Sequence, residues 1–327
     1  EPSNGEHLLT VVNPSTGMRI ATIRESSEDD VHRAVASARA ALPGLRDLGA
    51  TARTQLLVAL AEELSKRKVA LAEAVTREMG MPAAHCIEHQ VEPAIEVVRA
   101  TAQALSDVPF RERFDHSVVQ REPIGVVGVV APWSYPALHA MTKIAAAIAA
   151  GCSVVFKPSK YAPLDALVIA EAVNLVFGTG PHIGEALVRH PQVSMVSITG
   201  SQRVGRRVLH VAAANLKPVS LEVGGKSSSV ALEDADLPAF VSHAVRSVMI
   251  NTGQTCNART RVVVPFQRLT EVEELVKDAM SSYRIGLSHD PRTDVGPLAN
   301  GDQHYRVTSQ LDRAPLDGAR LEIGRAH

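Results

Sequence analysis

The run Ile124-Gly125-Val126-Val127-Gly128-Val129-Val130 decides the fold of this 327-residue chain. It is apolar without alternation, which is typical of a strand buried on both faces of a parallel sheet. Helical and apolar stretches follow it in turn. The expected helices and strands alternate as helix 136–150, strand 153–156, helix 164–173, strand 175–177, helix 183–189, strand 195–199, helix 202–214 and strand 219–223. This pattern predicts an α/β fold with helices on both faces of a parallel sheet.

Residue types that carry chemistry follow several of these expected strands. Directly after an apolar run come Pro132-Trp133-Ser134, Lys157-Pro158-Ser159 and Thr199-Gly200-Ser201, and Glu222 lies near the end of the last run. Open parallel sheets bind ligands at the carboxyl ends of their strands. We therefore expect these side chains to meet at one edge of the sheet.

The segments before the sheet region are expected to form a strand pair and several helices. The strand pair spans 8–24, and a capping-box pattern at Ser27 opens a helix that Pro43-Gly44 should end. Apolar residues at helical spacing predict further helices over 51–78 and 86–105.

One junction between a helix and a strand is unusually tight. Glu171-Ala172-Val173-Asn174 should end a helix, and Leu175 should begin a strand, with no glycine, proline or charged turn between them. Helix-to-strand connections usually take about 2–6 residues. The sequence at this junction is therefore expected to lack a short loop.

Composition excludes several classes of protein. Hydrophobic residues make up 45% and charged residues 21%, with a net charge of −1, so the chain is globular and carries no basic footprint for nucleic acid. The length favours two domains. The apolar region 124–156 is interrupted by Pro132, Lys143 and Gly151, so we expect no membrane span and no membrane partner. The first residues lack the features of a signal peptide.

The three cysteines, Cys86, Cys152 and Cys256, form no CxxC pair, so the sequence predicts no metal site and no disulfide framework. A reduced, cytoplasmic protein is the expectation. Cys256 differs from the others because it ends the small polar run Gly253-Gln254-Thr255-Cys256. A cysteine nucleophile needs a base that later activates water, and upstream Glu222 beside two glycines is the candidate. Cys86 and Cys152 are expected to be structural.

Taken in order, these motifs closely resemble those of the aldehyde dehydrogenase superfamily. The matching segments are Ala131–Pro136, Lys157–Ser159, Ile198–Ser201, Leu221–Lys226, Gly253–Cys256 and Asp294–Leu298. The resemblance implies a Rossmann-like NAD(P)-binding domain over 1–223, with 111–123 as an oligomerisation hairpin. It also implies that 224–327 is the first part of an α/β catalytic domain. The implied activity is oxidation of an aldehyde to a carboxylic acid, with NAD or NADP as cofactor.

The resemblance also implies roles for three catalytic residues. Cys256 attacks the aldehyde to give a thiohemiacetal that becomes a thioester, and Glu222 activates the water that hydrolyses it. Ser134 stands where the family usually has an asparagine whose amide helps to hold the oxyanion. Serine is shorter and offers one donor instead of two, and loss of such a donor costs about 10²–10³ in rate.

For the cofactor, the resemblance implies contacts from the ends of the expected strands. Lys157 is expected to bind the adenosine ribose, and Ser201 is expected near the pyrophosphate at a helix start. Lys160 replaces the glutamate that many NAD-preferring members carry, which predicts tolerance of NADP or preference for it. The full expected set is Pro132, Trp133, Lys157, Ser159, Lys160, Gly200, Ser201 and Val204.

Two other functions stay open at the level of sequence. A CoA-acylating relative would need no water-activating base, and Glu222 speaks against it. A catalytically silent binding or scaffold protein of the same family would show no turnover that depends on Cys256. The expected partners are a small aldehyde and further copies of the chain in a homodimer or homotetramer. The sequence contains no segment that predicts a carboxylate clamp or an aromatic cage, so it does not specify the aldehyde.

Overall fold

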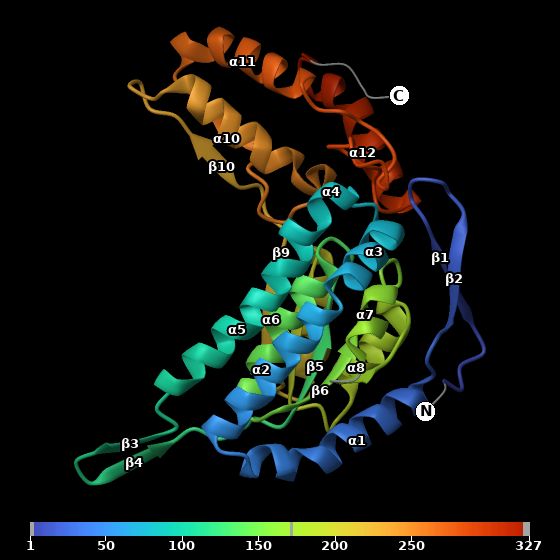
Figure 1. The fold of residues 1–327 in the computed structure, drawn as a ribbon, viewed down its shortest axis with the longest axis vertical. Helices are drawn as coiled ribbons and strands as arrows, with labels where there is room; N and C mark the ends of the chain where they lie inside the picture. The colour runs from blue at the N-terminus through green and yellow to red at the C-terminus, as the bar shows by residue number, and fades with distance from the viewer. Residues whose placement is uncertain (1–2, 171–172, 323–327) are drawn as a thin grey trace.

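The structure, a computed structural model, describes residues 3–170 and 173–322. Figure 1 shows a larger lobe built around a parallel sheet and a smaller lobe stacked on it along the long axis of the molecule. The sheet has five parallel strands in the order β7-β6-β5-β8-β9. Their bounds are β5 (Val126–Val130), β6 (Ser153–Lys157), β7 (Asn174–Leu175), β8 (Met195–Gly200) and β9 (Val219–Val223). The predicted α/β fold with a parallel sheet is confirmed.

Strand β5 occupies the centre of the sheet and explains why its sequence does not alternate. Val127 and Val129 pack into the core on one face, whereas Val126 and Val130 pack into the core on the other. In register, Val127 pairs with Val154 of β6 on one side and with Met195 of β8 on the other. After β5 the chain adds β6 and β7 on one side of that strand, and then crosses back to add β8 and β9 on the other side. In open parallel sheets, ligands bind at the carboxyl ends of the strands where the strand order reverses, which here are the ends of β5 and β8.

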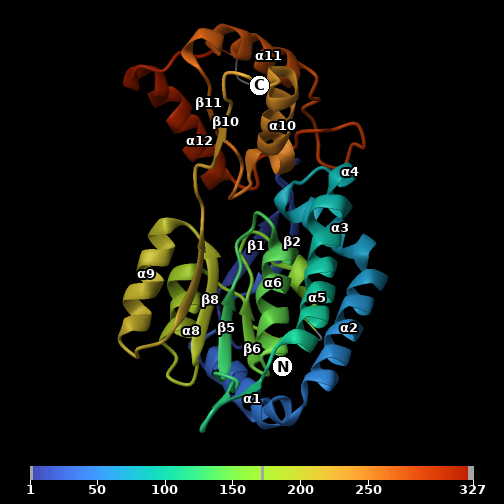
Figure 2. The same cartoon turned by 90° about the vertical axis from the view of Figure 1, so that its left-hand side faces the viewer.

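Helices cover both faces of the sheet (Figure 2). One face is covered by α6 (Pro136–Ala149), on which α2 (Ala50–Lys66) and α5 (Glu92–Ala104) pack as a second layer. The other face is covered by α1 (Glu28–Asp47), α8 (Glu185–Arg189) and α9 (Gln202–Ala213). Helix α1 begins with the predicted capping box, because Ser27 Oγ accepts from the Asp30 backbone and the Asp30 carboxylate accepts from the Ser27 backbone.

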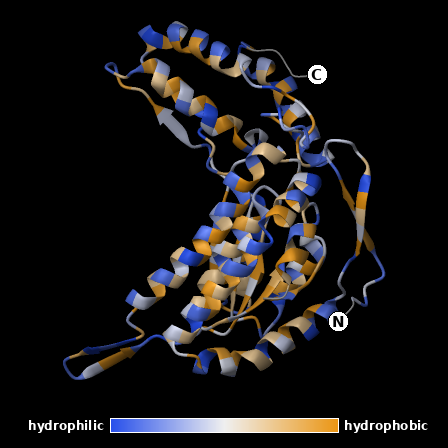
Figure 3. Ribbon diagram, in the orientation of Figure 1, coloured by the Kyte–Doolittle hydropathy of each residue, from blue (hydrophilic) through white to orange (hydrophobic). Residues whose placement is uncertain are grey.

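Two antiparallel hairpins lie at the surface of the larger lobe. The predicted strand pair is present as β1 (Leu8–Val12) and β2 (Arg19–Arg24). The second hairpin, β3 (Arg111–Phe114) and β4 (Ser117–Gln120), projects away from the lobe (Figure 1). Figure 3 shows a mostly hydrophilic β3 beside a more hydrophobic β4, on which Val118 and Val119 are exposed. The oligomerisation role of this hairpin stays a prediction.

Several helix boundaries were predicted wrongly. Helix α1 continues through Pro43 to Asp47, since a proline near an exposed helix end removes only one hydrogen bond. The helix expected over 51–78 is two helices, α2 and α3 (Lys68–Met79), which meet at Arg67. The helix expected over 86–105 is likewise divided, into α4 (Ala83–Cys86), a π-helical turn (Ile87–Val91) and α5.

Around the tight junction the elements are also shorter than predicted. Helix α7 (Leu164–Val168) ends well before Val173, and β7 has two residues. Residues 171–172 of the predicted short connection lie outside the described residues. The first turn of α7 is held by Glu78 of α3, whose carboxylate accepts from the backbone N–H groups of Leu164 and Asp165 at 2.5 and 3.0 Å.

The smaller lobe has its own core. Strands β10 (Ser228–Val230) and β11 (Arg261–Val263) pair in parallel, and helices α10 (Leu237–Met249), α11 (Leu269–Ser281) and α12 (Gly301–Arg313) accompany them. Leu237, Val241 and Val272 form part of this core. Across the described parts of the chain, no helix has both the length and the apolar character needed to cross a bilayer.

Candidate functional site

Cys256 is exposed in a loop that follows α10, and the backbone before it is strained. Asn251 and Thr252 have φ values of 53° and 58°, and Gly253 follows with φ 75°. Non-glycine residues rarely adopt the left-handed region, and such a run persists only where the surroundings hold it. The loop that presents Cys256 is therefore fixed by its contacts.

The first of these contacts joins the cysteine loop to the loop after β5. The side chain of Asn251, only 3% exposed, donates through Nδ2 to the main-chain oxygen of Ser134 at 2.7 Å. Gln90 Nε2 donates to the same oxygen at 2.9 Å. Ser134 is thus positioned through its carbonyl, and its Oγ makes no hydrogen bond within the described residues. The hydroxyl is free to turn toward a substrate oxygen.

A second set of contacts comes from the segment 294–298, noted in the sequence for its resemblance. The backbone N–H of Gly296 donates to Thr252 Oγ1 at 3.0 Å, and that of Ala299 donates to Gln254 Oε1 at 2.8 Å. Gly296 of this segment and Ala299 just after it therefore help to hold the cysteine loop.

Glu222 is exposed at the carboxyl end of β9, where the sequence placed it. The glycines that follow approach the cysteine closely, since the backbone N–H of Gly225 donates to the Cys256 oxygen at 3.2 Å. Lys143 on α6 lies near both side chains. Burial lowers the pKa of Lys143, and the charges of Glu222 and Cys256 raise it in opposition. The structure thus brings the predicted nucleophile and base together beside a buried ammonium group.

Lys143 was missed by the sequence prediction, in which it only interrupts an apolar run. It is 7% exposed, although it stands in a helix whose other buried residues are apolar. A lone lysine within so apolar a helix was the available signal. Charged groups are rarely buried unless something pairs with them.

Tyr135 and His139 complete the wall of the site on the side of α6. Tyr135 forms a hydrogen bond with Thr255 Oγ1 at 2.7 Å, and burial raises its pKa. Burial and the charge of Lys143 lower the pKa of His139 to about 4, so this imidazole is neutral at pH 7.

At the carboxyl end of β6, Lys157 is buried and its Nζ donates to the oxygens of Pro158 and Gly178 at 2.7 and 3.0 Å. Burial lowers its pKa to about 8, with the Glu25 charge raising it and the Lys160 charge lowering it. An ammonium group has three donors, so one remains for a ligand.

Lys160 is exposed and lies over the ring of Tyr161, with Nζ 4.6 Å from the ring centroid. The charge of Lys160 contributes to the lowered pKa of Lys157. Ser159 is buried, and its Oγ accepts from the Tyr161 backbone at 3.2 Å, which orders this turn.

On the other side of β5, Ser201 caps α9, because its Oγ accepts from the Val204 backbone at 3.3 Å. Gly200 ends β8 directly before this cap, and Val204 is partly exposed on the first turn. Pro132 and Trp133 follow β5 and are half-buried. The predicted cofactor residues therefore lie at or just after the carboxyl ends of β5, β6 and β8. A helix start on one side and lysines on the other fit the phosphates and ribose of a dinucleotide.

A pocket of about 540 Å³ opens at Cys256. Side chains from α6, the π-helical turn, α10 and the cysteine loop line it. Those with polar groups include His89, Tyr135, His139, His243, Arg246 and Arg259. A volume of this size is typical of small-molecule sites.

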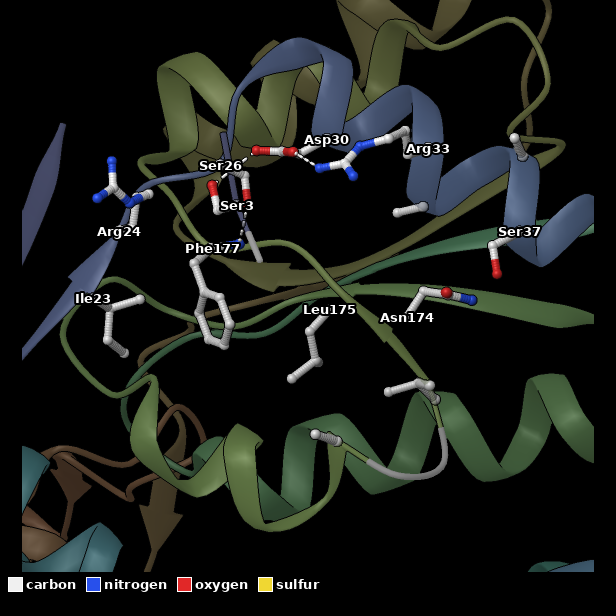
Figure 4. A pocket seen from close by; sticks show the side chains of 14 residues that line it. Ser3, Ile23, Arg24, Ser26, Asp30, Arg33, Ser37, Asn174, Leu175 and Phe177 are labelled. Atoms are coloured by element: carbon white, nitrogen blue, oxygen red, sulfur yellow. Dashed lines mark hydrogen bonds and ion pairs between the residues drawn. The ribbon is translucent and has the colours of Figure 1, made fainter. Parts of the chain in front are cut away.

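A separate cavity of about 800 Å³ lies between α1 and β7 (Figure 4). Its polar end is occupied by Asp30, whose carboxylate accepts from Ser3, Asn4, Ser27 and Arg33. Burial works to raise the pKa of Asp30, but these hydrogen bonds hold it well below its usual range. None of the predicted site residues lines this cavity, and its carboxylate already has partners. We assign it no catalytic role.

Comparison with known proteins agrees with this geometry. The sequence profile described as "Aldehyde dehydrogenase family" matches residues 1–327. A relative from Pseudomonas sp. named 3-succinoylsemialdehyde-pyridine dehydrogenase is 37% identical over 331 residues, which cover 98% of this chain and 69% of the relative.

Solved structures show the same architecture. A mutant of aldehyde dehydrogenase C from Pseudomonas syringae, in complex with NAD+ and octanal, is 38% identical with a TM-score of 0.97, over 99% of this chain and 69% of that one. An Escherichia coli enzyme described as NADP dependent is 30% identical with a TM-score of 0.95, over 100% of this chain and 71% of that one. The chain belongs to the aldehyde dehydrogenase family.

Proposed function

We propose that this protein oxidises an aldehyde to a carboxylic acid through a thioester on Cys256, with NAD or NADP as the hydride acceptor. The observation that carries the proposal is the placement of Cys256. It lies exposed at a pocket, on a strained loop, with Glu222 and Lys143 beside it. NAD+ and octanal in the Pseudomonas syringae structure support the same chemistry.

In the first step the Cys256 thiolate attacks the aldehyde carbon, and the carbonyl oxygen becomes the oxyanion of a thiohemiacetal. Two donors near Cys256 are unengaged within the described residues, namely its own backbone N–H and the hydroxyl of Ser134. We assign both to the oxyanion. The fixed carbonyl of Ser134 sets where its hydroxyl can reach.

When bound, the nicotinamide would supply the hydride acceptor for the thiohemiacetal carbon, which becomes a thioester on losing hydride. Lys157 and the start of α9 at Ser201 would hold the cofactor beside β5. Lys160 adds a second cation there.

In the second half of the reaction Glu222 takes a proton from water, whose oxygen attacks the thioester carbon. The Cys256 thiolate leaves, and the product is a carboxylic acid. Burial lowers the pKa of Lys143, and the charges of Glu222 and Cys256 act on its ammonium group in the opposite direction.

Kinetics of two variants and one control variant test this assignment. Cys256→Ser should abolish formation of reduced cofactor with any aldehyde, whereas Cys152→Ala, at a buried cysteine outside the pocket, should retain it. Glu222→Gln should give one equivalent of reduced cofactor per site and then stop, because the thioester persists. Absence of turnover in the unaltered protein would instead identify a silent binding relative. A requirement for CoA in place of water would identify an acylating enzyme.

We further propose a boundary between cofactor and catalytic domains at Val223, a homodimer or homotetramer paired through the 111–123 hairpin, and a cytoplasmic location. The separate core of the smaller lobe supports the domain boundary. The exposed valines of β4 support pairing of subunits through the hairpin. The free thiols support a reducing compartment.

A further inference from the structure

The pocket at Cys256 has a one-sided charge. Two arginines line it, Arg246 from α10 and Arg259 from the segment just after the cysteine, and none of its lining residues is an aspartate or glutamate. His243 stands one turn before Arg246 and lines the same pocket, so this face of α10 presents both side chains to the substrate space.

Neither guanidinium group has a carboxylate partner or a side-chain hydrogen bond within the described residues. Other arginines of this chain are paired, for example Arg207 with Glu185 at 2.7 Å and Arg268 with Glu271 at 3.2 Å. The charges of Arg246 and Arg259 are therefore uncompensated. A pocket that holds two unpaired cations focuses a positive potential on whatever enters it.

The charge of Arg246 acts on His89, which lines the same pocket. Burial lowers the pKa of His89 and the Arg246 charge lowers it further, although Glu88 acts in the other direction. Burial also keeps His139 neutral. These imidazoles are hydrogen-bonding groups at pH 7, and the positive charge of the pocket resides on the arginines, which stay protonated.

We propose that the preferred substrates are aldehydes with a distal carboxylate, which Arg246 and Arg259 bind while the aldehyde carbon reaches Cys256. Guanidinium groups match carboxylates in geometry as well as charge, and a neutral aldehyde would leave both cations unpaired. The inference rests on the proposed function, because it names the substrate class of the same site.

The first test compares two substrates of nearly equal shape, 4-oxobutanoate and its methyl ester. The unaltered enzyme should have a kcat/KM at least tenfold higher for the carboxylate. Arg246→Met and Arg259→Met should each lower the carboxylate value by about 10- to 100-fold, as expected for one lost charge-assisted interaction, and leave the ester value nearly unchanged. Arg39→Met, at an exposed arginine of α1, is the matched control and should change neither.

A second test needs no hydride transfer. Cys256 is alkylated with anionic iodoacetate or with neutral iodoacetamide, and the ratio of the two rates is followed by mass spectrometry, with Cys256→Ser as the background for the other thiols. The ratio should fall about threefold or more in Arg246→Met and Arg259→Met, and stay constant in Arg39→Met.

The outcomes separate the two proposals. An unchanged ratio, or equal losses for carboxylate and ester, overturns the anion-binding inference even if turnover is normal. A ratio that falls as expected, in a protein that oxidises no aldehyde, supports the anion site and overturns the proposed function.

Discussion

Asn251 donates through Nδ2 to the main-chain oxygen of Ser134 at 2.7 Å, and this bond joins the loop of the nucleophile to the loop that follows β5. One loop belongs to the smaller lobe and the other to the sheet of the larger lobe. The bond therefore sets the distance between the thiol and the oxyanion donor on Ser134. It also helps to hold Asn251 in its left-handed conformation.

Replacing Asn251 by alanine should weaken both the fold and the site. The variant loses two side-chain hydrogen bonds and places a poorer residue in a left-handed conformation, so we expect a loss of about 1–3 kcal/mol in the free energy of unfolding. Urea denaturation measures this loss, and the rate of Cys256 alkylation reports on the loop. Asn215→Ala, at an exposed amide with one long bond, is the control. Equal stability of the two variants would contradict the role of Asn251.

Changing Ser134 tests the oxyanion assignment. Ser134→Asn adds a longer side chain with two donors, so kcat should rise, by up to about 100-fold, with little change in KM. Ser134→Ala should lower kcat because it removes the only side-chain donor at this position. Steady-state kinetics with one aldehyde measure both. Identical kcat values for the serine and alanine forms would show that Ser134 does not contact the oxyanion.

Lys160 should govern the choice between NAD and NADP. Lys160 and Lys157 repel each other, and a phosphate on the ribose would relieve that repulsion. The unaltered protein should bind NADP+ at least as well as NAD+, and Lys160→Glu should shift the ratio of dissociation constants toward NAD+ by about tenfold or more. Calorimetric titration measures the ratio, with Lys160→Gln separating loss of the cation from gain of the anion. Equal binding of both cofactors by both proteins would refute the idea.

The buried carboxyls of Glu78 and Asp165 should make stability depend on pH. Burial raises the pKa of Asp165 to about 7, and burial with the Asp165 charge raises that of Glu78. The folded state therefore holds protons that the unfolded chain releases near pH 4, so stability should fall as pH rises from about 4 to about 7. Asp165→Asn removes part of this loss and should be more stable than the unaltered protein by about 1–3 kcal/mol at pH 8.

Chemical denaturation at pH 4.5 and pH 8 measures the effect. Asp234→Asn, at an exposed aspartate that makes no ion pair or side-chain hydrogen bond within the described residues, should leave the pH dependence unchanged. If the stability of Asp165→Asn followed the same pH curve as the unaltered protein, the Glu78 and Asp165 pair would not be its cause.

The parallel sheet could be predicted because β5 is buried on both faces, which removes the alternation seen in half-exposed strands. Helix ends were harder to predict. A proline usually ends a helix. Near the exposed end of α1, however, Pro43 costs only one hydrogen bond, and the helix continues to Asp47. The break at Arg67 has no proline or glycine to announce it.

The roles of Cys256 and Glu222 stay predictions, and they rest on motifs that are local in the sequence. Arg246 and Arg259 come from two separate segments, and nothing in their spacing indicates a common pocket. Only the packing of α10 and the cysteine loop brings them together, and only the packing of α6 brings Lys143 near Glu222 and Cys256. The sequence therefore indicates the reaction better than it indicates the substrate.

The bonds from Gly296 and Ala299 to the cysteine loop span 44 and 45 residues of chain. During synthesis, Cys256 leaves the exit tunnel while Gly296 and Ala299 are still being added or are still inside the ribosome. The thiol is thus present on the growing chain while the loop that positions it still lacks its hydrogen bonds to Gly296 and Ala299. Reactivity toward aldehydes is expected to be acquired late in translation, as a property of the assembled lobes and not of the cysteine peptide itself.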